Sequence, residues 1–198
     1  MSHSPAMNRI RCAAVLAGGL STRMGRDKAL LTVEGEPLVR RTARTLESLF
    51  QNVIVVTNRA QVADAAQVPS VGDGHTNKGP LAGIEAALNY FGEATFIVAC
   101  DLPYLSADLI EFQRQQWNPQ WDALVAQSED GIEPMHAIWA PSALSVVSVA
   151  LEAPRPPSLR RLQRDLQVGT LTIEQARRFD AHLRCFENWN TPEDVEDV

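Results

Sequence analysis

The stretch RCAAVLAGGLSTRMGRDK, residues 11–28, decides both the fold and the kind of site that we expect. Its first seven residues read as a short buried strand that runs directly into Gly18 and Gly19. Because these glycines have no Cβ, the chain can turn sharply off the strand and present backbone N–H groups to an anion. Arg23 supplies a planar fork for phosphate oxygens, and Lys28 supplies a compact charge on a flexible stem. The loop predicts polyphosphate binding; the alternative is an ordinary strand-to-helix turn that carries solvated cations.

The spacing of the glycines excludes two better-known phosphate-binding loops. The pattern GxxxxGK[ST] is absent because Gly25 is followed by Arg26. The pattern GxGxxG is absent because the two opening glycines are adjacent. The stretch therefore argues against a P-loop hydrolase and against a standard nicotinamide-binding enzyme.

Strands alternate with helices along the rest of the chain. Continuous apolar runs such as NVIVVTN, residues 52–58, suit strands that are covered on both faces. We expect strands at 11–17, 30–33, 52–58, 68–71, 94–100, 121–128, 135–139, 170–173 and 185–189. We expect helices that begin at or near Pro37, Ala60, Pro80, Ser106, Pro141, Ser158 and Thr191. This order predicts a single domain over residues 1–198, with a loose tail at 1–8, built as a three-layer α/β/α sandwich around a mainly parallel, Rossmann-like sheet.

Three features follow predicted strands and can meet at one edge of this sheet. They are the glycine-rich loop, the loop before Gly79, and Asp101. In such sheets, ligands bind beyond the carboxyl ends of the strands, near a switch in strand order. Asp101 is the best candidate for a magnesium ligand, because a carboxylate just past a buried strand is rigidly placed and Mg²⁺ takes one or two carboxylates with phosphate oxygens and water. The alternative is that Asp101 caps the turn or helix that follows.

The composition limits which binding partners and which cellular compartment we expect. With 18 Lys and Arg against 24 Asp and Glu, the net charge is −6, which argues against general binding to nucleic acid or to an anionic membrane surface. Cys12, Cys100 and Cys185 are widely spaced and read as buried free thiols in a reducing cytoplasm, and no Cys/His cluster suggests zinc. No apolar run approaches the roughly 18–20 residues that span a bilayer, and we see no secretory segment. We therefore expect a soluble cytoplasmic protein.

Four motifs together resemble one enzyme family. The stretch VLAGGLSTRMGRDKALL, residues 15–31, resembles the glycine-rich signature of the nucleotidyltransferases in the nucleotide-diphospho-sugar transferase-like superfamily. Its LAGG…RMG..K form is similar to that of the molybdenum cofactor guanylyltransferases, the molybdopterin-guanine dinucleotide biosynthesis protein A family. The motifs GPLAG at 79–83, CDLP at 100–103 and NWNTPED at 188–194 follow in family order and at comparable separations. The resemblance therefore covers nearly the whole chain.

This resemblance implies a reaction. GMP would be transferred from GTP to the terminal phosphate of molybdopterin that carries molybdenum, forming the dinucleotide cofactor and releasing pyrophosphate with the help of Mg²⁺. A phosphate nucleophile is already anionic at neutral pH, so positioning and charge neutralisation should carry the catalysis. The resemblance implies that Arg23, Lys28 and Asp101 are catalytic, with Asp101 as metal ligand. A molybdenum insertase and molybdoenzyme chaperones are the protein partners that such an enzyme would meet.

Two other classes of function stay open. One is a different transfer on the same fold, by a molybdenum cofactor cytidylyltransferase or another small nucleotidyltransferase. The forms LAGG and GPLAG are those of the guanylyl type, so the resemblance favours GTP. The other is a non-catalytic nucleotide-binding module, which the joint presence of Arg23, Lys28 and Asp101 disfavours.

The resemblance also implies a set of nucleotide-binding residues. Asp73 resembles the family aspartate that contacts the nucleotide, and its carboxylate could accept from the N1–H and N2–H₂ edge of guanine; its loop could equally be a simple turn. Gly79 and Pro80 begin a helix whose N-terminus favours anions or polar base edges, although they could be only a helix start. The full set is Leu16, Ala17, Gly18, Gly19, Lys28, Asp73, Gly79, Pro80, Leu81, Gly83 and Asp101.

The second substrate is assigned to the C-terminal part. Asn188 and Asn190 alternate in an extended segment and could hydrogen-bond a pterin or its phosphate; the alternative is an Asn/Thr cap at Thr191. Arg160 and Arg161 could bind the molybdopterin phosphate, or could simply lie on a helix surface.

Three further polar residues receive no part in the chemistry. His136 is given no catalytic role, because the resemblance around it is loose. Arg26 is interpreted as a solvated surface arginine, since its position varies in the family pattern. Asp27 is interpreted as a local ion-pair or turn residue rather than a second metal ligand.

Overall fold

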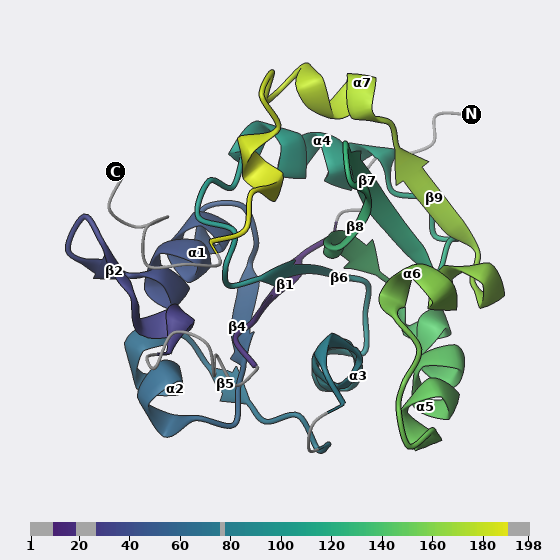
Figure 1. Cartoon of the computed structure of the whole chain (residues 1–198), viewed down its shortest axis with the longest axis horizontal. Helices are drawn as coiled ribbons and strands as arrows, with labels where there is room; N and C mark the ends of the chain where they lie inside the picture. The colour runs from purple at the N-terminus through teal and green to yellow at the C-terminus, as the bar shows by residue number, and fades with distance from the viewer. Residues whose placement is uncertain (1–9, 19–26, 76–77, 190–198) are drawn as a thin grey trace, which may run out of the picture.

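A seven-stranded sheet forms the centre of the protein. The computed structural model describes residues 10–18, 27–75 and 78–189, and within these residues the strand order is β5-β4-β1-β6-β8-β7-β9 (Figure 1). All neighbours are parallel except at β8, which is antiparallel to both β6 and β7. The strands are β1 (Cys12–Leu16), β4 (Asn52–Val56), β5 (Ser70–Val71), β6 (Thr95–Ala99), β7 (Ala123–Ser128), β8 (Gly131–Trp139) and β9 (Val168–Leu171). A small hairpin of β2 (Thr32–Val33) and β3 (Glu36–Pro37) stands apart from it.

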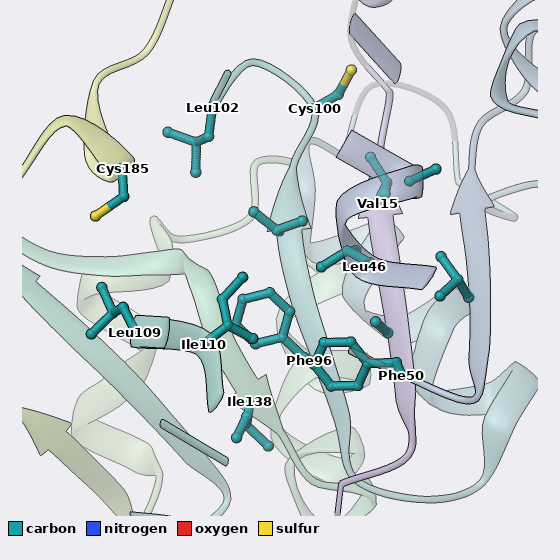
Figure 2. Packing of buried hydrophobic residues seen from close by; sticks show 14 of the residues in the cluster. Val15, Leu46, Phe50, Phe96, Cys100, Leu102, Leu109, Ile110, Ile138 and Cys185 are labelled. Carbon is teal, nitrogen blue, oxygen red and sulfur yellow. The ribbon is translucent and has the colours of Figure 1, made fainter. Parts of the chain in front are cut away.

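Helices cover both faces of this sheet. The helices are α1 (Leu38–Glu47), α2 (Ala60–Ala66), α3 (Pro80–Phe91), α4 (Ala107–Gln116), α5 (Leu144–Glu152), α6 (Leu159–Leu162) and α7 (Ile173–Arg177). Successive strand residues point to opposite faces, so Val15 belongs to the buried cluster that includes residues of α1, α2, α4 and α7, whereas Ala14 and Leu16 belong to the cluster that includes residues of α3, α5 and α6. On the first face, Phe96 of β6 stacks on Phe50 beside Leu46 of α1 (Figure 2). The expected three-layer α/β/α sandwich with a mainly parallel sheet is confirmed.

The strand order creates a crevice at one edge. From β1 the chain moves to β4 and β5 on one side, and then returns to β6 on the other side of β1. Leu16 pairs with Val56 of β4 and with Ala99 of β6, so the three central strands end level with one another. Connections that leave β1 and β6 in opposite directions open a crevice at their carboxyl ends. The residues that follow these three strands therefore meet at one edge of the sheet.

Several expected elements differ from the observed ones. The expected strand at 30–33 is reduced to β2, because Lys28–Leu30 forms a 3₁₀ turn. The expected strand at 170–173 ends at Leu171, because Thr172 caps α7 in a reciprocal pair of hydrogen bonds with Gln175. The expected strand at 185–189 is wrong: Arg184–Phe186 is a 3₁₀ turn, and residues 187–189 form no strand.

The expected helix caps and chain ends can also be compared with the structure. Ser106 and Ser158 do cap helices, since their side chains accept hydrogen bonds from the backbone of Leu109 and Arg161. The expected C-terminal helix and the N-terminal tail lie outside the described residues. In the part of the chain that the structure describes, no helix has the length and apolar content to cross a membrane.

Candidate nucleotide site

Backbone hydrogen bonds join the carboxyl end of β1 to those of β6 and β4. The N–H of Cys100 donates to the carbonyl of Leu16 at 3.1 Å, and the N–H of Ala17 donates to the carbonyl of Val56 at 3.0 Å. Leu16 and Ala17 are buried, whereas Gly18 is exposed. Gly18 is therefore the first residue after β1 that faces the edge of the sheet.

Asp101 lies at this edge, two residues beyond β6. It is half-buried, and its carbonyl accepts a hydrogen bond from the N–H of Trp189 at 3.1 Å. Burial raises the pKa of the Asp101 carboxyl above its ordinary value, while the positive charge of Lys28 acts in the opposite direction. Lys28 and Asp101 therefore share one electrostatic environment, although 73 positions of sequence separate them. Because burial disfavours the charged carboxylate, a cation bound beside Asp101 would stabilise it, which suits a cation site.

The loop after β5 brings Asp73 to the same place. Asn58, which follows β4, donates from Nδ2 to Asp73 Oδ1 at 2.7 Å and to the Asp73 carbonyl at 3.3 Å. A Cβ built on Gly18 would lie 3.7 Å from Asp73 Oδ2. The carboxylate of Asp73 thus lies against the bare backbone of Gly18, and Asn58 holds its orientation.

The N-terminus of α3 also opens toward this edge. Gly79 caps α3 with φ 68° and ψ −158°, a conformation that is essentially limited to glycine, and no side chain caps the helix. Pro80 follows as the first helical residue, and both residues are exposed. Leu81 and Gly83 instead pack inward: a Cβ on Gly83 would lie 2.8 Å from Leu16 Cδ1. Gly83 therefore lets α3 approach β1 closely, and Gly79 allows the turn into the helix.

Asp27 has the local role that was predicted. Its carboxylate forms an ion pair with Arg59 and also accepts from the N–H of Ala29 at 3.1 Å, at the start of the 3₁₀ turn that contains Lys28. In the described part of the chain, no group of three or more His, Cys, Asp or Glu side chains is arranged to hold a metal ion.

The residues assigned to the second substrate fall in two places. Asn188 is exposed and directly precedes Trp189, so it lies beside Asp101. Arg160 lies at the same edge of the sheet but farther along it, where its guanidinium is 3.7–3.9 Å from a Cβ built on Gly131 in the β7–β8 turn. Arg161 donates its backbone N–H to Ser158 as part of the helix cap. Gly19, Arg23, Gly25, Arg26 and Asn190 lie outside the described residues.

His136 lies in the core. Its ring is fully buried between the edge-on rings of Phe96 and Phe186. A cavity of about 580 Å³ lies at the opposite, amino-terminal edge of β4, lined by residues that include Phe50, Val68 and Tyr90. No predicted site residue lines that cavity, so the chemistry-bearing groups converge elsewhere.

Sequence reasoning missed the residues that follow β4. Thr57 donates from Oγ1 to the carbonyl of Ala17 at 3.2 Å, Asn58 holds Asp73, and Arg59 holds Asp27. A signal was available, because polar residues directly after a buried strand are the criterion that selected Asp101. The polar residues at 57–59 carry the same signal, since they follow the apolar run at 53–56.

Three comparisons with known proteins give consistent matches. Residues 13–169 match the family model described as MobA-like NTP transferase domain. A molybdenum cofactor guanylyltransferase of Syntrophotalea carbinolica is 34% identical over 187 residues, which cover 93% of this chain and 88% of the relative. A probable molybdenum cofactor guanylyltransferase of Peptoclostridium acidaminophilum is 32% identical over 190 residues, covering 92% and 86%. The crystal structure of molybdopterin-guanine dinucleotide biosynthesis protein A from Archaeoglobus fulgidus is similar with a TM-score of 0.80 at 28% identity, covering 93% and 95%.

Proposed function

This chain belongs to the family of MobA-like NTP transferase domains, and from that premise we propose that it transfers GMP from GTP to the terminal phosphate of molybdopterin carrying molybdenum. A phosphate oxygen of the acceptor attacks the α-phosphorus of GTP. The bond between the α-phosphorus and its bridging oxygen breaks, and pyrophosphate leaves. The names of the relatives support the guanylyl and molybdenum cofactor parts of this proposal.

One observation carries the proposal: Gly18 and Asp101 follow the neighbouring strands β1 and β6 at their carboxyl ends, and the positive charge of Lys28 acts on the Asp101 carboxyl. Gly18 offers unobstructed backbone to phosphate oxygens, and Lys28 offsets the negative charge of the triphosphate and of the departing pyrophosphate. Two anions must approach each other in this reaction, so neutralising and positioning them is the main task of the protein. Arg23 would add a second cation to this set.

Asp101 is the residue that would hold Mg²⁺. A single desolvated carboxylate fits this ion, which takes one or two protein carboxylates and fills its other positions with phosphate oxygens and water. When bound, Mg²⁺ supplies charge neutralisation on the phosphates. The chain itself fixes the backbone of Asp101, because Asp101 lies two residues beyond β6 and its carbonyl accepts a hydrogen bond from the N–H of Trp189.

Guanine is assigned to the loop after β5 and to the start of α3. Asp73 would accept from the N1–H and N2–H₂ groups of the base, an edge that cytosine lacks, and Asn58 already fixes this carboxylate. Gly79 and Pro80 would border the base and ribose at the uncapped N-terminus of α3. Leu81 and Gly83 pack the buried side of this helix against the sheet.

The pterin substrate is assigned to the side of Asp101 that Asn188 occupies. Its amide would hydrogen-bond the pterin or its phosphate, together with Asn190. Arg160 would meet this substrate only if the molecule extends to the β7–β8 turn, where its guanidinium lies.

A nucleotide panel tests the proposal. Pyrophosphate release is measured with GTP, CTP or UTP, each with Mg²⁺ and molybdopterin, and we expect turnover with GTP. Turnover with CTP instead would identify a cytidylyltransferase, and GTP binding without turnover would identify a non-catalytic module.

A single variant tests the assignment of Asp101 as the magnesium ligand. Asp101→Ala should stay folded and lose Mg²⁺-dependent transfer, since the change removes the carboxylate that would hold the ion. Asp108→Ala, the same change at an exposed residue in the first turn of α4, is the matched control and should keep full activity. Near-wild-type turnover by Asp101→Ala would exclude this role.

A further inference from the structure

We propose that Arg59 is a positioning residue that ties Ala17 to Asp27 and thereby holds Gly18 and Lys28 in register for the nucleotide. The inference rests on the proposed function, because Gly18 and Lys28 matter in this way only if a nucleoside triphosphate binds between them. Arg59 itself is not required to touch the substrate.

The guanidinium of Arg59 contacts two separate segments with its two terminal nitrogens. Its Nη2 donates to the carbonyl of Ala17 at 2.6 Å, and its Nη1 forms an ion pair with Asp27 Oδ2. These partners are ten positions apart in the sequence. Because the guanidinium is planar and rigid, the two contacts constrain the two segments relative to each other.

Arg59 is itself held at the end of β4. Its backbone N–H donates to Thr57 Oγ1 at 3.3 Å, and the same hydroxyl donates to the carbonyl of Ala17 at 3.2 Å. The carbonyl of Ala17 therefore accepts two hydrogen bonds from the turn that follows β4. The side chain of Arg59 is 31% exposed and that of Asp27 is 18% exposed, so water screens this pair less than a surface pair.

Each end of this connection adjoins a predicted phosphate contact. Ala17 directly precedes Gly18. Asp27 uses its second oxygen, Oδ1, to accept from Ala29 and so defines the start of the 3₁₀ turn that carries Lys28. The two oxygens of Asp27 thus have different tasks, one toward Arg59 and one toward the turn. Without Arg59, GTP has to order Gly18 and Lys28 as it binds, and this ordering reduces the free energy of GTP binding.

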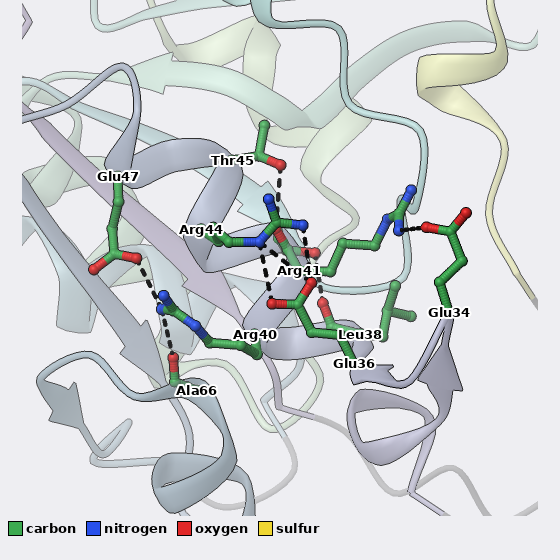
Figure 3. Close-up of polar contacts among 10 residues, drawn as sticks. Glu34, Glu36, Leu38, Arg40, Arg41, Arg44, Thr45, Glu47 and Ala66 are labelled. Atoms are coloured by element: carbon green, nitrogen blue, oxygen red, sulfur yellow. Dashed lines mark hydrogen bonds and ion pairs between the residues drawn. The ribbon is translucent and has the colours of Figure 1, made fainter.

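Arg40 offers a matched control for a purely structural role. It also joins a carboxylate and a backbone carbonyl, since its Nη1 donates to Glu47 at 2.8 Å and to the carbonyl of Ala66 at 3.3 Å (Figure 3). Its side chain is 19% exposed. Ala66 is the last residue of α2, whereas Arg59 precedes its first, so the two arginines lie at opposite ends of that helix.

The test compares Arg59→Gln with Arg40→Gln in the full-length protein. Binding of GTP with Mg²⁺ is measured by calorimetry, kcat and KM by pyrophosphate release, and Tm by circular dichroism. We expect Arg59→Gln to weaken GTP binding about tenfold or more, because GTP must then order the two segments that Arg59 no longer holds. Arg40→Gln should lose a similar amount of thermal stability and bind GTP within about twofold of wild type.

Asp27→Asn provides an independent readout. The asparagine can still accept from Ala29 but loses the ion pair with Arg59. We expect the same weakening of GTP binding as in Arg59→Gln, and no further loss in the double variant, because both changes remove one connection. Additive losses would contradict a shared role.

The outcomes separate the two proposals. Wild-type protein that binds no nucleotide overturns both of them. Wild-type protein that binds GTP, together with Arg59→Gln that binds it equally well, overturns this inference alone, and so does an equal loss in Arg40→Gln. If Arg59→Gln fails to fold, Arg59→Lys decides: it keeps the charge but cannot reach both partners, so wild-type affinity in a folded Arg59→Lys would also overturn the inference.

Discussion

Replacing the buried His136 by leucine should remove a large part of the acid sensitivity of this protein. The ring is fully buried on β8, with the centroids of Phe96 and Phe186 at 5.1 and 5.2 Å. Within the described residues, neither ring nitrogen has a hydrogen-bond partner. Burial lowers the pKa of His136 from 6.5 to about 4, because the apolar surroundings disfavour the charged ring.

The sign and size of the effect follow from the difference between the folded and unfolded chains. Above pH 6.5 the ring is neutral in both, so it adds no pH dependence. Between pH 6.5 and about 4 the His136 ring binds a proton in the unfolded chain but stays neutral in the folded chain. The free energy of unfolding therefore falls by about 1.4 kcal/mol for each pH unit in this window. Over this whole window the loss amounts to about 3 kcal/mol.

Urea unfolding at several pH values between 7.5 and 4.5, followed by circular dichroism, measures this contribution. His136→Leu should show a shallower decline in the free energy of unfolding, so that its stability relative to wild type improves steadily below pH 6.5. Carboxylates titrate in both proteins and cancel in the difference. His182→Leu, the same change at an exposed histidine, is the control and should follow the wild-type profile. Parallel pH profiles for wild type and His136→Leu would refute the reasoning.

Two glycine substitutions test the backbone geometry. Gly79→Ala has open space for its Cβ, so its cost is purely conformational, roughly 1–3 kcal/mol at φ 68°, and should appear as a lower Tm together with weaker GTP binding. Gly169 lies on β9, and Gly169→Ala would bring its Cβ within 2.6 Å of Trp121 Cδ2; overpacking of about 2 kcal/mol should lower Tm by roughly 4–8 °C with nucleotide affinity unchanged. Gly74→Ala, which has no atom within 4 Å of its Cβ, should leave Tm as it is; a similar fall in all three would contradict both explanations.

The hairpin of β7 and β8 has a local sequence signal that would have predicted its turn. The strands are joined by Glu129 and Asp130, and Gly131 begins β8 with φ 113°. Asp-Gly between two apolar runs is a known hairpin signal, and it explains why β8 runs antiparallel in an otherwise parallel sheet. Thr172 and Gln175 carry a similar local signal, because their spacing predicts a capping box and thus the end of β9.

By itself, the sequence determined the elements and the character of the chemistry. Apolar runs and caps act over a few residues, so the central strands, most helices and the cap at Ser106 could be predicted within a residue or two. The position of Asp101 after a buried strand, and the glycines and cations of residues 18–28, indicated a phosphate site for the same reason.

Only the tertiary structure decided which of these residues meet. That β1 lies between β4 and β6 depends on pairing between segments that are 40 and 83 residues apart, and no local pattern encodes this order. Because β5 lies beside β4, Asn58 reaches Asp73, and because β4 lies beside β1, Arg59 joins Ala17 to Asp27. The glycine-rich loop could be found in the sequence, but the residues that hold its two ends became visible only when the strands lay side by side.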